Sequence, residues 1–122
     1  MDKLDVKIGN VLRDIGIPVN ILGYQYIRKA IKLCLYDNSY SYNITKMLYP
    51  EIAKQCDTTA SRAERAIRHA IEKACLIGNL ELQQNIFGHT ISPNKGKPTN
   101  SDFIAAVVEY IYANIETKAK AD

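Results

Sequence analysis

The stretch Thr58–Ile71, TTASRAERAIRHAI, is the most informative part of this 122-residue chain. Three of the chain's five arginines fall there within seven residues, and arginine makes flat, two-pronged hydrogen bonds to carboxylates, phosphates and guanine edges. The pattern predicts an amphipathic helix that begins at Ala60-Ser61 and ends at Gly78-Asn79. Its apolar residues recur at helical spacing up to residue 74: Ala63, Ala66, Ile67, Ala70, Ile71 and Ala74.

One side of this helix is expected to pack on the domain while the other carries its charge, since successive side chains lie about 100° apart around the axis. Alanine dominates the apolar side, which lets the helix lie close to its support. Ser61 followed by Glu64 three residues later is typical of a capping box. The polar side has Glu64 at its border and otherwise consists of Ser61, Arg62, Arg65, Arg68, His69 and Glu72.

A shorter helix is predicted directly before it, in YPEIAKQCD, residues 49–57. Its start, Tyr49-Pro50-Glu51, places a proline and an acid in the first turn, where both are favoured. Asp57-Thr58-Thr59 then breaks the helix. Two helices joined by a tight turn, with alanine at their crossing, predict a helix-turn-helix over about residues 49–78.

In that motif the first turns of the second helix lie nearest to the base edges of DNA. Arginine can read guanine O6 and N7, and glutamate can accept a hydrogen bond from cytosine N4. Base contact is therefore predicted for Arg62, Glu64, Arg65 and Arg68. Hydroxyls and free backbone N–H groups at a helix start can bind phosphate, so contact with the DNA backbone is predicted for Thr58, Thr59 and Ser61.

Two other interpretations of the arginine helix stay open on its pattern alone. Its polar side can be a solvated face on which Glu64 pairs with Arg68 at i,i+4 spacing. It can also belong to a protein-interaction module that docks on an acidic partner. Alanines at positions 63, 66 and 70 favour a helix backed by its own domain over one that binds a partner through large exposed apolar anchors.

The remaining segments predict further helices and no strand. Apolar residues at helical spacing span residues 4–15, ended by Gly16 and Pro18, and residues 24–35, ended by residues 37–39. A short helix is predicted over residues 80–87, a Pro- and Gly-containing loop over residues 92–100, and a last helix capped by Asn100 or Ser101. The predicted fold class is all-α, with about six helices in a single domain over residues 1–122.

Composition argues against a membrane or secreted protein. The longest apolar run, Phe103–Val108, is far shorter than the roughly 18 residues of a membrane span, and the N-terminus lacks the apolar core of a signal peptide. The formal charge of +3 is only mildly basic, so the placement of charge matters more than its sum.

Nothing in the sequence predicts a metal, a cofactor or catalysis. The three cysteines, Cys34, Cys56 and Cys75, form no C-x-x-C pair, and His69 and His89 have no metal-ligand spacing. The cysteines fall on apolar positions, so we expect reduced core residues in a cytoplasmic protein. No serine or cysteine nucleophile is patterned near His69, so we do not expect an enzyme.

Three stretches closely resemble one known family. They are ITKMLYPEIAKQCDTTASRAERAIRHAIEKA at residues 44–74, KPTNSDFIA at residues 97–105 and IGIPVNILGYQYIRKAI at residues 15–31. All three resemble the C-terminal DNA-binding domain of stage zero sporulation protein A, the master response regulator of sporulation. The likeness runs from Ile8 to about Tyr112, and SRAERAIRHAI and KPTNSDFIA are peculiar to that family.

The resemblance implies a six-helix effector domain that activates or represses transcription by binding double-stranded promoter boxes of TGTCGAA type, usually in tandem copies. Full-length members also carry an N-terminal phosphoacceptor receiver domain. This chain is too short for a receiver and has no alternating βα pattern, so we expect the effector part alone. With no long apolar seam left over, we expect a monomer that pairs head to tail on tandem sites. By motif match, the recognition helix carries Arg62, Glu64, Arg65 and Arg68.

Four further positions carry predictions. His69 flanks the base-contacting residues and is assigned to the DNA backbone. Lys95 and Lys97 are assigned to phosphates beside the box, with exposed loop lysines as the alternative. The family's contact with the sigma subunit of RNA polymerase maps to ELQQNIFGHTI, residues 81–91, where Phe87 is the best match and a buried helix-end anchor is the alternative. Docking on such a subunit is also the alternative function for the whole domain.

Overall fold

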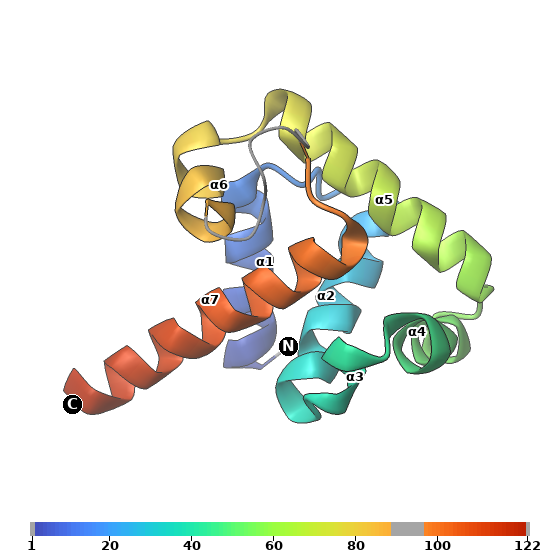
Figure 1. Ribbon diagram of the computed structural model, residues 1–122, viewed down its shortest axis with the longest axis horizontal. Helices are drawn as coiled ribbons and strands as arrows, with labels where there is room; N and C mark the ends of the chain where they lie inside the picture. The colour runs from blue at the N-terminus through green and yellow to red at the C-terminus, as the bar shows by residue number, and fades with distance from the viewer. Residues whose placement is uncertain (1, 89–96, 122) are drawn as a thin grey trace.

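The computed structural model describes residues 2–88 and 97–121, with side chains up to residue 114. Within these residues the protein is all-α and contains no strand, which confirms the predicted fold class (Figure 1). Its elements are α1 (Lys3–Ile15), α2 (Leu22–Tyr36), α3 (Ser39–Tyr42), a π-helical turn (Ile44–Leu48), α4 (Tyr49–Gln55), α5 (Ala60–Ile77), α6 (Leu80–Phe87) and α7 (Asn100–Ala121). The four-residue α3 and the π-helical turn lie within residues 39–48, where no helix was predicted.

The arginine-bearing helix α5 is packed against α2 at a point where neither helix has a large side chain. A Cβ added to Gly23 of α2 would overlap the carbonyl oxygen of Ala66 and lie 2.6 Å from the Cβ of Ala70. Glycine facing alanine therefore lets the two helix backbones approach closely. The alanine stripe predicted from the sequence is the surface by which α5 joins the core, and Ala63, Ile67, Ala70, Ile71 and Ala74 are buried.

The C-terminal end of α5 is held by contacts with α1 and α6. At its C-terminal end, Gly78 lies against Gly16, whose φ of 113° is in the left-handed region that glycine adopts without strain. The side chain of Gln83 donates to the carbonyl oxygens of Ile15 (2.8 Å) and Ala74 (2.9 Å). The last carbonyls of α1 and α5 are thus bound by one amide of α6.

The predicted capping residues of two helices are wrong. The N-cap of α5 is Thr59, whose hydroxyl accepts from the backbone N–H of Arg62 at 3.1 Å. Its extended backbone, with φ of −107° and ψ of 156°, aims the hydroxyl at that amide, and Ser61 lies inside the first turn. At α7, Thr99 accepts from the N–H of Asp102 at 3.1 Å, so neither predicted residue caps that helix.

The predicted placement of the cysteines on apolar positions agrees with the structure. Cys34 is buried, Cys56 and Cys75 are half-buried, and none of the three forms a disulfide. Burial raises the pKa of the Cys34 and Cys75 thiols, which favours the protonated form at neutral pH. In the described part of the chain, no helix combines the length and apolar character needed to cross a bilayer.

Candidate nucleic-acid interface

The turn between α4 and α5 sets the angle of the predicted helix-turn-helix. After α4 ends at Gln55, Asp57 adopts a left-handed conformation with φ of 52°. Its neighbour Thr58 donates its backbone N–H to the carbonyl of Ala53 at 2.9 Å, a bond typical of a helix that ends in a left-handed residue. The chain therefore reverses within Cys56–Thr59, and the start of α5 is held beside α4 (Figure 1).

The side of α5 that points away from the core is the candidate reading face, which we define as Ser61, Arg62, Arg65, Arg68 and His69. All five residues are exposed, as the periodicity predicted. Arg65 lies opposite the buried stripe at about 100° per residue. Among the described residues, the side chains of Arg62, Arg65 and His69 have no hydrogen-bond or ion-pair partner. Their donors are available to a ligand.

Arg68 differs from the other two arginines because it pairs with Glu64. Its Nη1 lies 2.8 Å from Glu64 Oε1, and the two side chains are 54% and 34% exposed. This is the i,i+4 pair that the sequence left open. Exposed pairs of this kind contribute only about 0.3–0.5 kcal/mol, so a ligand with a better partner for Arg68 can displace Glu64 at small cost.

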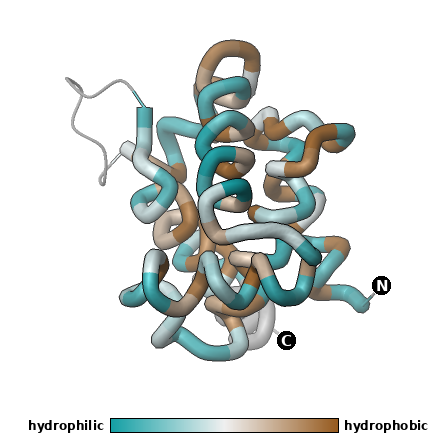
Figure 2. The backbone as a smooth tube through the Cα atoms, turned by 90° about the vertical axis from the view of Figure 1, so that its right-hand side faces the viewer, coloured by the Kyte–Doolittle hydropathy of each residue, from teal (hydrophilic) through white to brown (hydrophobic). Residues whose placement is uncertain are grey.

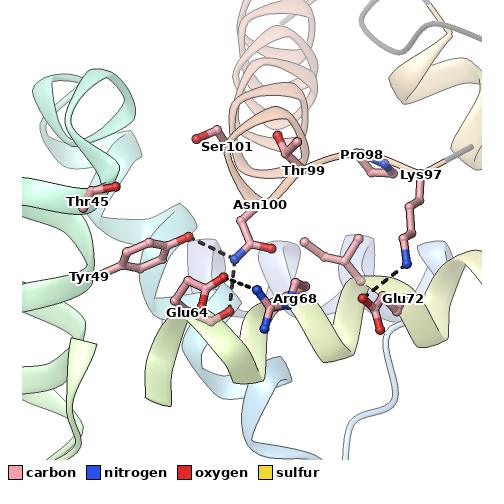
Figure 3. A pocket seen from close by; sticks show the side chains of 11 residues that line it. Thr45, Tyr49, Glu64, Arg68, Glu72, Lys97, Pro98, Thr99, Asn100 and Ser101 are labelled. Carbon is pink, nitrogen blue, oxygen red and sulfur yellow. Dashed lines mark hydrogen bonds and ion pairs between the residues drawn. The ribbon is translucent and has the colours of Figure 1, made fainter. Parts of the chain in front are cut away.

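Beside the reading face, a groove separates α5 from the start of α7 (Figure 3). Asn100 reaches across it and donates from Nδ2 to the hydroxyl of Tyr49 (2.9 Å) and to the backbone carbonyl of Glu64 (3.1 Å). Farther along, Lys97 Nζ lies 3.2 Å from Glu72 Oε1. Burial is the largest effect on Tyr49 and raises the pKa of its phenol, outweighing the bond from Asn100.

The residues predicted to contact the DNA backbone lie around this face in different states. Thr58 is half-buried, and the Thr59 hydroxyl is already occupied by its capping bond. Ser61 and Lys97 are exposed, and the bond to Glu72 holds Lys97 beside α5. Lys95, like His89, lies outside the described residues. Ser61 thus lies on the reading face at the start of α5, Lys97 lies beside the same helix at Glu72, and Thr59 caps the helix.

Phe87 is buried, with 5% of its surface exposed. Its ring packs on Phe103 of α7 with centroids 5.2 Å apart. This confirms the interpretation of Phe87 as a helix-end anchor, while its contact with a sigma subunit stays a prediction. Any direct contact made by α6 has to come mainly from exposed neighbours, because a buried ring offers almost no surface.

The sequence pattern missed an exposed apolar patch where α5 passes into α6. It consists of Leu76, Ile77 and Leu80, which are 84%, 74% and 72% exposed. Figure 2 shows the hydrophobic colouring gathered at the top of the molecule, where α5 ends. A signal was present, since Leu76 falls on the polar side of the helix at about 100° per residue. Large aliphatic side chains left in water at one place mark contact surfaces.

Within the described residues, no group of three or more His, Cys, Asp or Glu side chains is arranged to hold a metal ion. The features that the site does possess are an α-helical pair with a tight left-handed turn and unpaired arginines on the outer face of its second helix. A fold and site of this kind define the helix-turn-helix class of DNA-binding domains.

Comparison with known families identifies the family to which the chain belongs. Residues 8–111 match the family model described as the sporulation initiation factor Spo0A C terminal. The chain therefore belongs to the family of the C-terminal domain of sporulation initiation factor Spo0A, a response regulator of transcription. The match confirms the resemblance seen in the sequence, and the family is one of DNA-binding regulatory domains rather than of known enzymes.

Proposed function

We propose that this domain binds double-stranded promoter boxes of TGTCGAA type and so activates or represses genes that control the start of sporulation. The observation that carries the proposal is the exposure of Arg62 and Arg65 on α5, with no partner among the described residues. The opposite side of that helix is buried against α2. The helix can therefore enter a major groove without unpacking the domain.

Two kinds of contact would have different roles in DNA binding. Arg62, Arg65 and Arg68 would read guanine edges in the major groove, and Glu64 would accept from a cytosine amino group. Ser61, His69 and the loop lysines would lie at phosphates, which position the domain and release counterions but carry little sequence information. Because Glu64 and Arg68 pair in the free protein, reading by either one requires their bond to open or to be shared with a base.

The test is a fluorescence anisotropy titration of a labelled TGTCGAA duplex, of copies in which single guanines are replaced, and of random duplex, across a salt series. The proposal requires tighter binding to the box than to random DNA at every salt concentration, and a loss of about 1–3 kcal/mol for each guanine read by arginine. Equal binding to box and random duplexes would contradict it.

A second candidate function, contact with the sigma subunit of RNA polymerase, is favoured by the apolar patch at Leu76, Ile77 and Leu80. The patch lies at the C-terminal end of α5, away from the turn that brings the start of this helix towards DNA. It adjoins α6, the segment to which the family's sigma contact maps. Phe87 would then act as the anchor that holds α6 in place, rather than as the contacting ring.

This second candidate is tested by the double variant Leu76→Ser/Ile77→Ser. Transcription from a promoter activated by the wild-type domain should fall, while box affinity stays unchanged. Reduced box affinity with unchanged activation per bound domain would contradict a separate protein surface.

We further propose that residues 1–122 act as one effector domain in the cytoplasm and pair head to tail on tandem boxes. Analytical ultracentrifugation with a duplex that carries two boxes tests the pairing.

A further inference from the structure

The side chain of Asn100 forms hydrogen bonds that helix capping does not explain. It is the first residue of α7, but Thr99 caps that helix, so the Asn100 side chain is left free for other partners. It extends to α5 and α4, where its amide nitrogen donates both protons, to the Glu64 carbonyl and to the Tyr49 hydroxyl (Figure 3). One half-buried amide thus links three helices that are distant in the sequence.

The carbonyl that Asn100 binds belongs to the turn of α5 that carries Glu64 and Arg68. In an α-helix the carbonyl of Glu64 also accepts from the backbone N–H of Arg68. The side chains of the same two residues form the exposed ion pair. The bond from Asn100 therefore fixes the roll and height of this turn relative to α4 and α7, from the flank of α5 that lines the groove.

We infer that Asn100 is a positioning residue for base reading: it holds the Glu64–Arg68 turn of α5 at the depth and rotation that the major groove requires. The inference rests on the proposed function. Asn100 itself need not touch a base. A tilt of α5 would move guanidinium groups several bonds away from the backbone by more than the tolerance of a two-pronged hydrogen bond. The phosphate contacts of the loop lysines tolerate such a tilt better, because their side chains are long and flexible.

The consequence is a specific pattern of loss. Asn100→Ala should lower the ratio of box affinity to random-duplex affinity about ten-fold, the scale expected when hydrogen bonds in a shared network are lost. It should leave random-duplex affinity and the salt slope within error of wild type. Tyr49→Phe, which keeps the buried ring and removes one acceptor, should give a smaller loss in the same direction.

The matched control is Asn114→Ala. Asn114 lies on the same helix and donates to a backbone carbonyl, that of Tyr110, at 3.0 Å, but α5 takes no part in that bond. Its box-to-random ratio should equal that of wild type. A readout of structure alone, the melting temperature, is measured for all three variants so that a loss of reading can be separated from a loss of fold.

The outcomes separate this inference from the proposed function. If wild type fails to prefer the box, the proposed function fails. If wild type prefers the box and Asn100→Ala keeps the full ratio, or weakens box and random duplex equally, only the positioning role fails. Should Asn100→Ala not fold, Tyr49→Phe decides: an unchanged ratio in a folded Tyr49→Phe overturns the inference, and a reduced ratio supports it.

Discussion

Gly23 of α2 lies directly against the carbonyl oxygen of Ala66 of α5, with no room for a methyl group between them. This crossing holds α5 in the domain. Gly23→Ala should therefore destabilise the protein by about 1–3 kcal/mol, because the added Cβ forces two helix backbones apart. Guanidinium denaturation measures the change. Gln25→Ala, on the exposed side of the same helix, should stay within about 0.5 kcal/mol of wild type, and an equal effect of both changes would contradict the prediction.

Arg65 lies farthest from the core on the reading face. Arg65→Ala should weaken box binding by about 1–3 kcal/mol and relax the preference for guanine at one position, since a two-pronged contact is lost. Anisotropy titration against the guanine-substituted duplexes locates that position. Arg13→Ala on α1 removes the same charge elsewhere and should lower affinity for box and random DNA alike. Unchanged box binding by Arg65→Ala would show that this face does not read DNA.

The Glu64–Arg68 pair can be tested from its acidic side. Glu64→Gln keeps the shape of the side chain and removes the charge that holds Arg68. Folding stability should change by less than about 0.5 kcal/mol, because the pair is exposed. Random-duplex affinity should rise, since Arg68 is released and a negative charge leaves the interface, while discrimination at a cytosine should fall. A stability loss of several kcal/mol would mean that the pair is structural.

Asp57 occupies a left-handed position that carries strain for side chains branched at Cβ. Asp57→Val should destabilise the domain by about 1–2 kcal/mol, because its φ of 52° brings the branched Cβ against the backbone. Asp57→Gly should retain or raise stability, since glycine adopts this conformation freely. Thermal unfolding compares the two variants directly. Equal stability of the valine and glycine variants would show that the turn relaxes to another conformation.

An ion pair between α1 and α2 predicts acid sensitivity. Lys32 lies 2.9 Å from Asp5, and this hydrogen bond is the main cause that holds the pKa of Asp5 below its ordinary value of 3.8. A depressed carboxyl pKa means that the unfolded chain binds protons first. The stabilisation is therefore present above pH 3.8 and is lost as the pH falls through the lower, folded-state pKa.

Lys32→Met should remove that part of the pH dependence. The free energy of unfolding of the variant should fall less steeply than that of wild type below pH 4, a prediction that urea titrations at several pH values check. Lys29→Met on the same helix is the control, because within the described residues Asp5 pairs with Lys32 and not with Lys29. Identical slopes for wild type and Lys32→Met would contradict the assignment.

The sequence by itself determined the longer helices and the polar face of α5. Periodicity, Gly16 and Gly78 are local signals, because helix geometry and glycine conformations depend on neighbours only a few residues away. That is why α6 was predicted at its observed bounds and why the arginines were correctly expected on the outer side of α5. The amino-acid sequences of residues 44–74 and 97–105 also indicated the family that the comparison confirms.

Only the tertiary structure decided which residues meet across the chain. Asn100 lies 51 residues from Tyr49 and 36 from Glu64, and no periodic pattern carries such a pairing. The burial of Phe87 on Phe103 and the exposure of Leu76 likewise depend on how whole helices pack. The observed N-caps of α5 and α7 also lie one or two residues before the predicted ones. Several neighbouring hydroxyls and amides could accept from the same backbone N–H groups, and the backbone angles of the folded chain determine which one does.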